Sequence, residues 1–127
     1  MTNEQKIEID ELMLRVEDGV IRGDVSFYLF RLGKLPDLSG VRVTGNFDCR
    51  GNGLTSLAGA PQSVGGYFDC SANRLADLAG APQDVGGNFN CQHAIRSLSG
   101  APRHVRGNFN CCDNELTTLA GAPQRVG

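Results

Sequence analysis

Hydrophobic and polar positions alternate with a period of two in a short segment that recurs along the chain. In residues 64–70, with the sequence VGGYFDC, the large apolar side chains are those of Val64, Phe68 and Cys70. Such alternation is typical of a β-strand that buries one face. Equivalent segments begin at five valines, which are separated by 21, 21, 20 and 21 residues: Val43, Val64, Val85, Val105 and Val126. The chain is therefore predicted to be a tandem repeat.

The repeating unit reads VxGxFxCxxNxLxxLxGAPxx and occurs in four copies: residues 43–63, 64–84, 85–104 and 105–125. A fifth copy begins at residues 126–127. Upstream, Leu35, Leu38 and Gly40 have the spacing of the LxxLxG half, which indicates a degenerate half repeat over residues 35–42. A period of about 20–29 residues is typical of leucine-rich solenoids, in which each unit is stabilised by its neighbours.

Stacking of the copies would place equivalent side chains in columns, with strands about 4.8 Å apart. The phenylalanine column is expected to contribute most to stability, because burial of each ring is worth roughly 1.5–3 kcal/mol. The second glycine of each Gly-Gly pair is expected to face a coil interior too thin for a side chain. The Gly-Ala-Pro segment favours the turn that closes each coil. The predicted columns are Phe47, Phe68, Phe89 and Phe109; Cys49, Cys70, Cys91 and Cys111; Leu54, Leu75, Ile95 and Leu116; and Leu57, Leu78, Leu98 and Leu119.

Residues 1–34 differ from the repeats because their apolar positions have helical spacing. Thr2 and Gln5 form a possible capping box, and Gly19 and Gly33 are candidate helix ends. We expect an α+β fold with a helical N-terminal cap, residues 1–34, and a leucine-rich-repeat-like β solenoid with a parallel sheet, residues 35–127. The cap either covers the open end of the first coil or binds a partner itself. The two predicted helical runs contain Ile9, Leu12, Val16 and Val20, then Val25, Tyr28, Leu29 and Leu32.

The core of the unit, FxCxxNxL, resembles the LxLxxNxL of leucine-rich repeats. The whole unit resembles the VGGxFxCxxNxLxxLxGAP repeats found in proteins of tailed bacteriophages and some bacteria, in which a short helical segment precedes the array. The likeness covers residues 43–126, about two thirds of the chain. It implies a solenoid fold and a viral setting, but no activity. Many members have more copies, so the four copies here are a departure.

The composition excludes several classes of protein. With 14 acidic and 12 basic residues and a formal net charge of −2, the chain is not a strongly basic nucleic-acid binder. It has no continuous apolar run of about 18–20 residues, as a membrane helix requires. Its first residues, MTNEQKIEIDELM, do not resemble an export signal. We therefore expect a cytoplasmic protein, located in the bacterial host if it is encoded by a phage.

No chemistry is expected from the cysteines, the glycine pairs or the histidines. The four repeat cysteines should stack in a line, whereas a zinc site requires ligands that converge on a point. Without an export signal, all five cysteines are expected to be free, with Cys112 facing outward. The Gly-Gly pairs lack the GxxxxGK[ST] pattern of a phosphate loop, and neither His93 nor His104 has an obvious carboxylate partner. We predict a non-enzymatic protein without metal or cofactor.

An asparagine column is predicted from Asn52, Asn73 and Asn114, whose side-chain amides would satisfy backbone groups of neighbouring coils. Copy three lacks this asparagine, because its segment 91–95, CQHAI, is one residue short. The ladder should be interrupted there and the corner reshaped. The irregularity is either simply tolerated or forms a notch around His93 that a partner recognises.

The outward positions of the strands provide the best binding hypothesis, because one flat sheet would present them together. Arginines such as Arg106, which suit bidentate contacts at interfaces, gather toward the C-terminal end. The expected function is a protein-binding solenoid, encoded by a phage, that inhibits or redirects a host defence protein. The predicted partner-binding residues are Asn46, Asp48, Tyr67, Asp69, Asn88, Asn90, His93, Arg106, Asn108 and Asn110.

The alternative function is a structural element that assembles with itself. The last coil carries Leu116, Leu119 and Val126 with no following residues to cover them. An uncovered parallel edge favours association. A homodimer joined through this C-terminal edge is therefore the second hypothesis.

Overall fold

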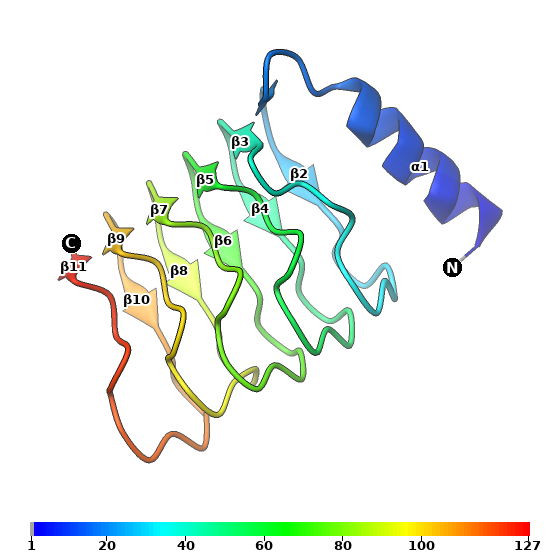
Figure 1. Ribbon diagram of the computed structural model, residues 1–127. Coiled ribbons are helices and arrows are strands. Elements are labelled where there is room, and N and C mark those ends of the chain that lie inside the picture. The colour runs from blue at the N-terminus through cyan, green and yellow to red at the C-terminus, as the bar shows by residue number, and fades with distance from the viewer. Residues whose placement is uncertain (1) are drawn as a thin grey trace.

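Each repeat forms one coil of a solenoid and carries two short strands separated by a bend (Figure 1). The coordinates are a computed structural model and describe residues 2–127. Coils of parallel strands follow a single helix, α1 (Asn3–Leu14), so the α+β solenoid predicted from the sequence is confirmed. The strands are β1 (Val20–Ile21), β2 (Val25–Ser26), β3 (Arg42–Val43), β4 (Phe47–Asp48), β5 (Ser63–Val64), β6 (Phe68–Asp69), β7 (Asp84–Val85), β8 (Phe89–Asn90), β9 (His104–Val105), β10 (Phe109–Asn110) and β11 (Arg125–Val126).

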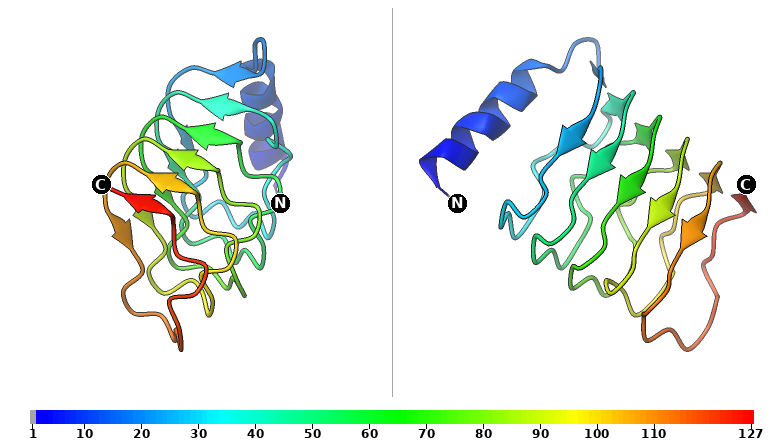
Figure 2. Two further views of the ribbon diagram at one scale, coloured as in Figure 1. Left: turned by 60° about the vertical axis from the view of Figure 1, so that its left-hand side comes forward. Right: turned by 180° about the vertical axis from the view of Figure 1, so that it is seen from behind.

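The strands form two parallel sheets in which neighbouring coils pair in register (Figure 2). Sheet A has the order β1-β3-β5-β7-β9-β11, and sheet B has the order β10-β8-β6-β4-β2. In sheet B, Phe68 pairs with Phe47 on one side and with Phe89 on the other. Because every strand pairs with the equivalent strand of the adjacent coil, identical residues stack on one another.

The prediction of one continuous strand per repeat is wrong, because its two halves lie in different sheets. The chain bends between them at two residues that are a Gly-Gly pair in copies two and three, Thr44-Gly45 in copy one and Arg106-Gly107 in copy four. The reason for glycine there also differs from the prediction. A Cβ on Gly87 would lie 2.9 Å from the main-chain carbon of Gly66, and one on Gly86 would collide with the main-chain oxygen of Gly65. Glycine is therefore required by the close approach of successive coils, rather than by a thin coil interior.

The predicted core columns are confirmed by the burial of their members in copies one to three, whereas the copy-four members are half-buried or, at Leu119, exposed. Phe47, Phe68 and Phe89 are fully buried, and their neighbouring ring centroids are 5.3 Å apart in stacked geometry. Phe109 continues the stack at 5.2 Å but is half-buried, because the last coil has a neighbour on one side only. The buried members of the other columns are Cys49, Cys70 and Cys91; Leu54, Leu75 and Ile95; and Leu57, Leu78 and Leu98.

The N-terminal region is only partly helical. The capping box is confirmed: the N–H of Gln5 donates to Oγ1 of Thr2 (3.1 Å), and Oε1 of Gln5 accepts from the N–H of Thr2 (2.8 Å). The helix ends at Leu14, and the predicted helix ends at Gly19 and Gly33 lie outside it, at positive φ.

The second predicted helical run is wrong, because residues 20–42 form an N-terminal coil of the solenoid. Ile21 pairs with Val43 in sheet A, and Val25 pairs with Phe47 in sheet B. Leu29 has φ of 55°, which is incompatible with a right-handed helix. Pairing with copy one therefore outweighs the helical spacing of the apolar residues, and the solenoid begins before residue 35.

Helix α1 packs against the N-terminal coil, at one end of the stack of coils (Figure 1). Leu12 is buried, and Ile9 is half-buried against the same core. Gln5 Nε2 donates to the carbonyl of Phe30, and a guanidinium nitrogen of Arg15 donates to the carbonyl of Arg22 at 2.8 Å. Among the described residues, no helix combines the length and apolar character needed to cross a membrane.

Candidate interaction site

The outer side of sheet B, together with the bends that lead into it, forms a polar face. Equivalent residues of successive copies lie side by side on it because the strands are in register. The structure therefore brings together most of the predicted partner-binding residues. Members of the polar face are Asn46, Asp48, Arg50, Tyr67, Asp69, Asn88, Asn90, Arg106, Asn108 and Asn110.

Arg50 organises the N-terminal part of the polar face. Its Nε and NH2 donate to the two carboxylate oxygens of Asp48, at 3.0 and 2.7 Å, and Nε lies 3.6 Å from Oδ2 of Asp69. The guanidinium also lies over the ring of Tyr28, 4.5 Å from its centroid. The hydrogen bonds to Asp48 raise the pKa of Arg50 above its ordinary value. Arg50 thus joins the side chains of Tyr28, Asp48 and Asp69 in one network of contacts.

Two members of this cluster depart from the prediction. Asp48 was expected to be exposed, but only 5% of it is accessible, because Arg50 covers its carboxylate. Tyr28 was assigned to a helix, yet it follows β2 and stands half-exposed beside Arg50. One sequence signal could have indicated this contact. Tyr28 precedes Arg50 by 22 residues, which is close to one repeat period and places it on the adjacent coil of the stack.

Tyr67 lies in the bend before β6 and is half-buried. Burial raises the pKa of its hydroxyl above the ordinary value, and the carboxylate of Asp48 raises it further. The hydroxyl therefore stays protonated at neutral pH and can donate a hydrogen bond. A partly buried tyrosine with few accessible rotamers is suited to an interface, because little entropy is lost when it binds.

Two asparagines of the face have a structural role. Oδ1 of Asn46 accepts from the N–H of Tyr67 at 2.9 Å, and Oδ1 of Asn88 accepts from the N–H of Asn108 at 2.8 Å. Both bonds join one copy to the next. Their amide oxygens therefore form hydrogen bonds within the solenoid, whereas we predicted that these asparagines contact a partner.

The basic residues at the C-terminal end are divided between two surfaces. Arg106 occupies the bend before β10 and is exposed on the polar face. His104 and Arg125 instead lie in sheet A, where they are register partners. His104 Nδ1 is 3.3 Å from a carboxylate oxygen of Asp84. The basic residues near the C-terminal end therefore share a face only in part.

The asparagine ladder is confirmed, together with its interruption in copy three. Oδ1 of Asn73 accepts from the N–H groups of Asn52 and Leu54, both at 3.0 Å. Oδ1 of Asn114 accepts from those of Ala94 and Ile95, at 2.8 and 2.9 Å. At the junction between copies two and three, copy three has no asparagine whose Oδ1 could accept from the N–H groups of copy two.

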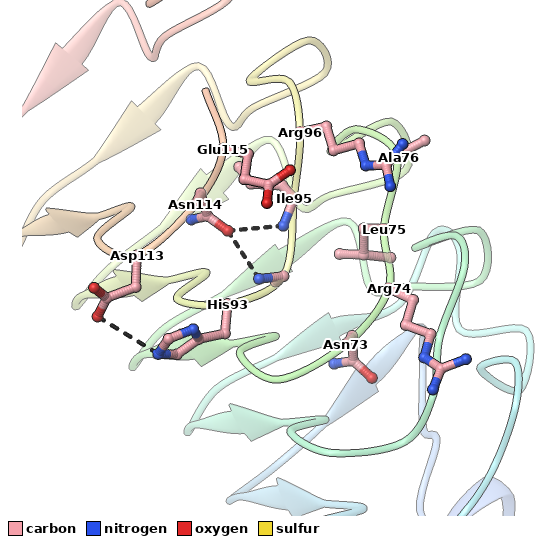
Figure 3. Close-up of a pocket in the computed structure, with 11 residues that line it drawn as sticks. Asn73, Arg74, Leu75, Ala76, His93, Ile95, Arg96, Asp113, Asn114 and Glu115 are labelled. Atoms are coloured by element: carbon pink, nitrogen blue, oxygen red, sulfur yellow. Dashed lines mark hydrogen bonds and ion pairs between the residues drawn. The ribbon is translucent and has the colours of Figure 1, made fainter. Parts of the chain in front are cut away.

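A groove with a volume of about 510 Å³ opens at this interruption (Figure 3). We call it the copy-three groove. His93, which was predicted to mark a notch, lines it at a φ of 51°, with Nε2 3.5 Å from a carboxylate oxygen of Asp113. The predicted reshaping of the corner is therefore confirmed, and recognition of the groove by a partner stays a prediction. Residues from three successive copies line it, including Asn73, Arg74, Leu75, Ile95, Arg96 and Glu115.

The last coil exposes part of its apolar column. Leu119 is 69% exposed and Val126 is 49% exposed, whereas Leu116 is half-buried against the core. β11 pairs with β9 on one side only within the described residues. The three residues predicted for self-association therefore share one end of the solenoid but differ in accessibility.

All five cysteines are free. Cys49, Cys70 and Cys91 are buried, and Cys112 is exposed as predicted. Burial raises the pKa of the three buried thiols well above the ordinary value, to about 12 for Cys91. Such thiols remain protonated and unreactive near neutral pH. Within residues 2–127, no three histidine, cysteine or acidic side chains are placed to hold a metal ion.

The stacked coils and the polar face together define the class of protein: a parallel β-solenoid of about five turns with a helix packed on its N-terminal coil. Comparison with protein-family models, with curated protein sequences and with solved structures gives no match. Functional inference therefore depends on the residues of the chain itself.

Proposed function

We propose that the chain is a non-enzymatic, protein-binding solenoid that uses the polar face as its contact surface. The observation that carries this proposal is the set of fixed contacts around Arg50, which hold Tyr28, Asp48 and Asp69 in place. Tyrosine and arginine are enriched among the residues that dominate binding energy. Because these side chains are already ordered, binding costs little additional conformational entropy.

For the biological setting, we propose a phage-encoded protein that blocks or redirects a host defence protein. The resemblance of the repeats to those of phage proteins supports this setting. A protein that acts on such a partner would be located in the host cytoplasm. The polar face is suited to this role because it is rigid and presents several hydrogen-bonding groups without a catalytic constellation.

The direct test is a triple variant of exposed or half-buried face residues, Tyr67→Ala, Arg106→Ala and Asn108→Ala. We expect it to bind the host partner about 100-fold more weakly or worse, because substitution of central tyrosine or arginine residues often costs about 2 kcal/mol or more each. The measurement is a pull-down from bacterial lysate, read by mass spectrometry, followed by titration calorimetry with the purified partner.

The matched control, which we call the sheet A triple variant, is alanine at Arg42, which lies in β3, and at Gln83 and Gln124, which immediately precede β7 and β11; all three are exposed. This control should retain the partner in full. Thermal melts establish that both variants fold. Equal retention of the partner by the two variants would show that the polar face is not the contact surface.

A second candidate function is self-assembly through the C-terminal coil, favoured by the exposure of Leu119 and Val126. For this function, we expect the wild-type chain to be a dimer in light scattering. Val126→Glu should be a monomer, because the substitution would bury a charge in the dimer interface. Thr55→Glu, an exposed position on copy one, is the control and should leave the mass unchanged. A wild-type monomer at high concentration, or a dimer that tolerates Val126→Glu, contradicts self-assembly through this end.

A further inference from the structure

The copy-three groove contains an unused hydrogen-bond donor. In the preceding copy, Asn73 Oδ1 accepts the N–H of Asn52 and the N–H of Leu54. The equivalent donors one coil later are the N–H groups of Asn73 and Leu75. Leu75 donates to the carbonyl of Ala94 at 2.7 Å, but the N–H of Asn73 has no acceptor within residues 2–127.

This donor is costly to leave unpaired. Asn73 is only 6% exposed, so its N–H is largely removed from bulk water, and yet the residue lines the groove. A buried donor without an acceptor has lost its hydrogen bonds to water and gained none in return. At this corner the other copies have an asparagine side chain, whereas copy three has Ala94, whose methyl group cannot accept a hydrogen bond. An oxygen acceptor that enters the groove would therefore regain a hydrogen bond that the chain itself does not make.

Two arginines line the groove and can attract an anionic acceptor, and the carboxylates of Asp113 and Glu115 line it as well. Arg74 and Arg96 are exposed and form no ion pair within residues 2–127. Figure 3 shows the guanidinium of Arg96 reaching toward Ala76 of copy two, with Glu115 on the copy-four side. The carboxylate of Asp113, also on the copy-four side, already faces His93.

The shape and the floor of the groove favour a peptide segment rather than a free ion. Leu75 and Ile95 line it and are buried, and the volume is large enough for several peptide units. We propose that the copy-three groove binds an extended segment of the protein partner through an aspartate or glutamate side chain, whose carboxylate accepts from the N–H of Asn73 in a groove that Arg74 and Arg96 also line. This proposal rests on the protein-binding function proposed above. The partner's carboxylate takes the place of the missing asparagine oxygen.

The test is a titration of the full-length ¹⁵N-labelled chain with acetyl-Gly-Asp-Gly-amide, followed by NMR. We expect the amide proton of Asn73 to move downfield and to saturate at roughly millimolar peptide, an affinity expected for so small a ligand. The corresponding Asn and Leu peptides and sodium acetate are titrated at the same ionic strength. An equal response to the Asn peptide would overturn the choice of a carboxylate, and an equal response to acetate would reduce the site to a general anion contact.

Two variants connect the response to the groove. The double variant Arg74→Ala, Arg96→Ala should weaken binding of the Asp peptide about tenfold or more. Insertion of one asparagine between His93 and Ala94 restores the spacing of the other copies, and should abolish the peptide response while protecting the Asn73 amide from hydrogen exchange. The sheet A triple variant is the control and should respond as wild type. Peptide binding that survives the asparagine insertion overturns the proposal.

This experiment separates the inference from the proposed function. If the peptides give no response at Asn73 but a lysate partner is lost with the polar-face variant, protein binding holds and the groove proposal fails. If the Asp peptide binds as described while no variant affects any partner, the groove is an acidic-peptide site and the polar face is not the contact surface.

Discussion

Replacement of Phe68 with alanine is expected to lower the free energy of unfolding by about 3–5 kcal/mol. The ring is fully buried and is stacked on Phe47 and Phe89 with centroids 5.3 Å away on both sides. Its removal leaves a cavity in the middle of the stack and breaks two ring contacts at once. Because each coil is stabilised only by its neighbours, a defect in copy two also weakens the coils on either side.

A loss of this size is a large part of the stability of a small domain, which is typically about 5–15 kcal/mol. We expect the melting temperature to fall by about 10–20 °C, measured by circular dichroism with urea titrations alongside. Phe109→Ala is the control, because that ring is only half-buried at the end of the stack. Phe109→Ala should lower the free energy of unfolding by about half as much as Phe68→Ala. A Phe68→Ala variant that melts within a few degrees of wild type would contradict the role of the phenylalanine column.

The second large effect is a loss of stability at alkaline pH. Burial raises the pKa of Cys49, Cys70 and Cys91 above the ordinary value of 9.0. As pH rises, the unfolded chain therefore releases thiol protons before the folded chain does. The stabilising contribution of each buried thiol is complete below pH 9 and is lost as pH rises toward the folded pKa, about 12 for Cys91.

At pH 10, each buried thiol is expected to lower the free energy of unfolding by on the order of 1–2 kcal/mol relative to pH 7. Urea unfolding curves at pH 7 and pH 10 measure this difference. Lysine and tyrosine also titrate in this range, so the informative quantity is the change caused by single substitutions. Cys70→Ala should reduce the pH 7 to pH 10 difference by on the order of 1–2 kcal/mol, whereas Cys112→Ala, at an exposed position, should not alter it. Equal pH dependence of the two variants would contradict burial of the cysteine column.

The repeat columns could be predicted from the sequence because each coil has copies of itself as neighbours. Once the valines set the register, Phe68 could pack only against Phe47 and Phe89, and Asn73 only beside Asn52. The same register made the defect in copy three visible, because one missing residue removes one asparagine from an otherwise regular ladder. These inferences required no knowledge of the handedness or curvature of the coils.

The N-terminal coil and the Arg50 cluster could not be predicted in this way. Residues 20–34 lack the repeat pattern, and their apolar spacing fits a helix as well as a coil, so only pairing of Val25 with Phe47 decided between them. The position of Tyr28 over Arg50 depends on that coil. Burial of Asp48 likewise follows from a side-chain contact with Arg50, which the alternation of inward and outward positions does not specify.

The repeat period is sufficient to establish a stack of coils with phenylalanine, cysteine and leucine columns and an interrupted asparagine ladder, because a regular period leaves equivalent residues no other neighbours. The bend that divides each repeat between two sheets became evident only in three dimensions, because it depends on how closely adjacent coils approach. The tertiary structure also decided that the N–H of Asn73 is left without an acceptor while that of Leu75 finds one. The shortened corner brings the carbonyl of Ala94 within reach of only one of these two donors.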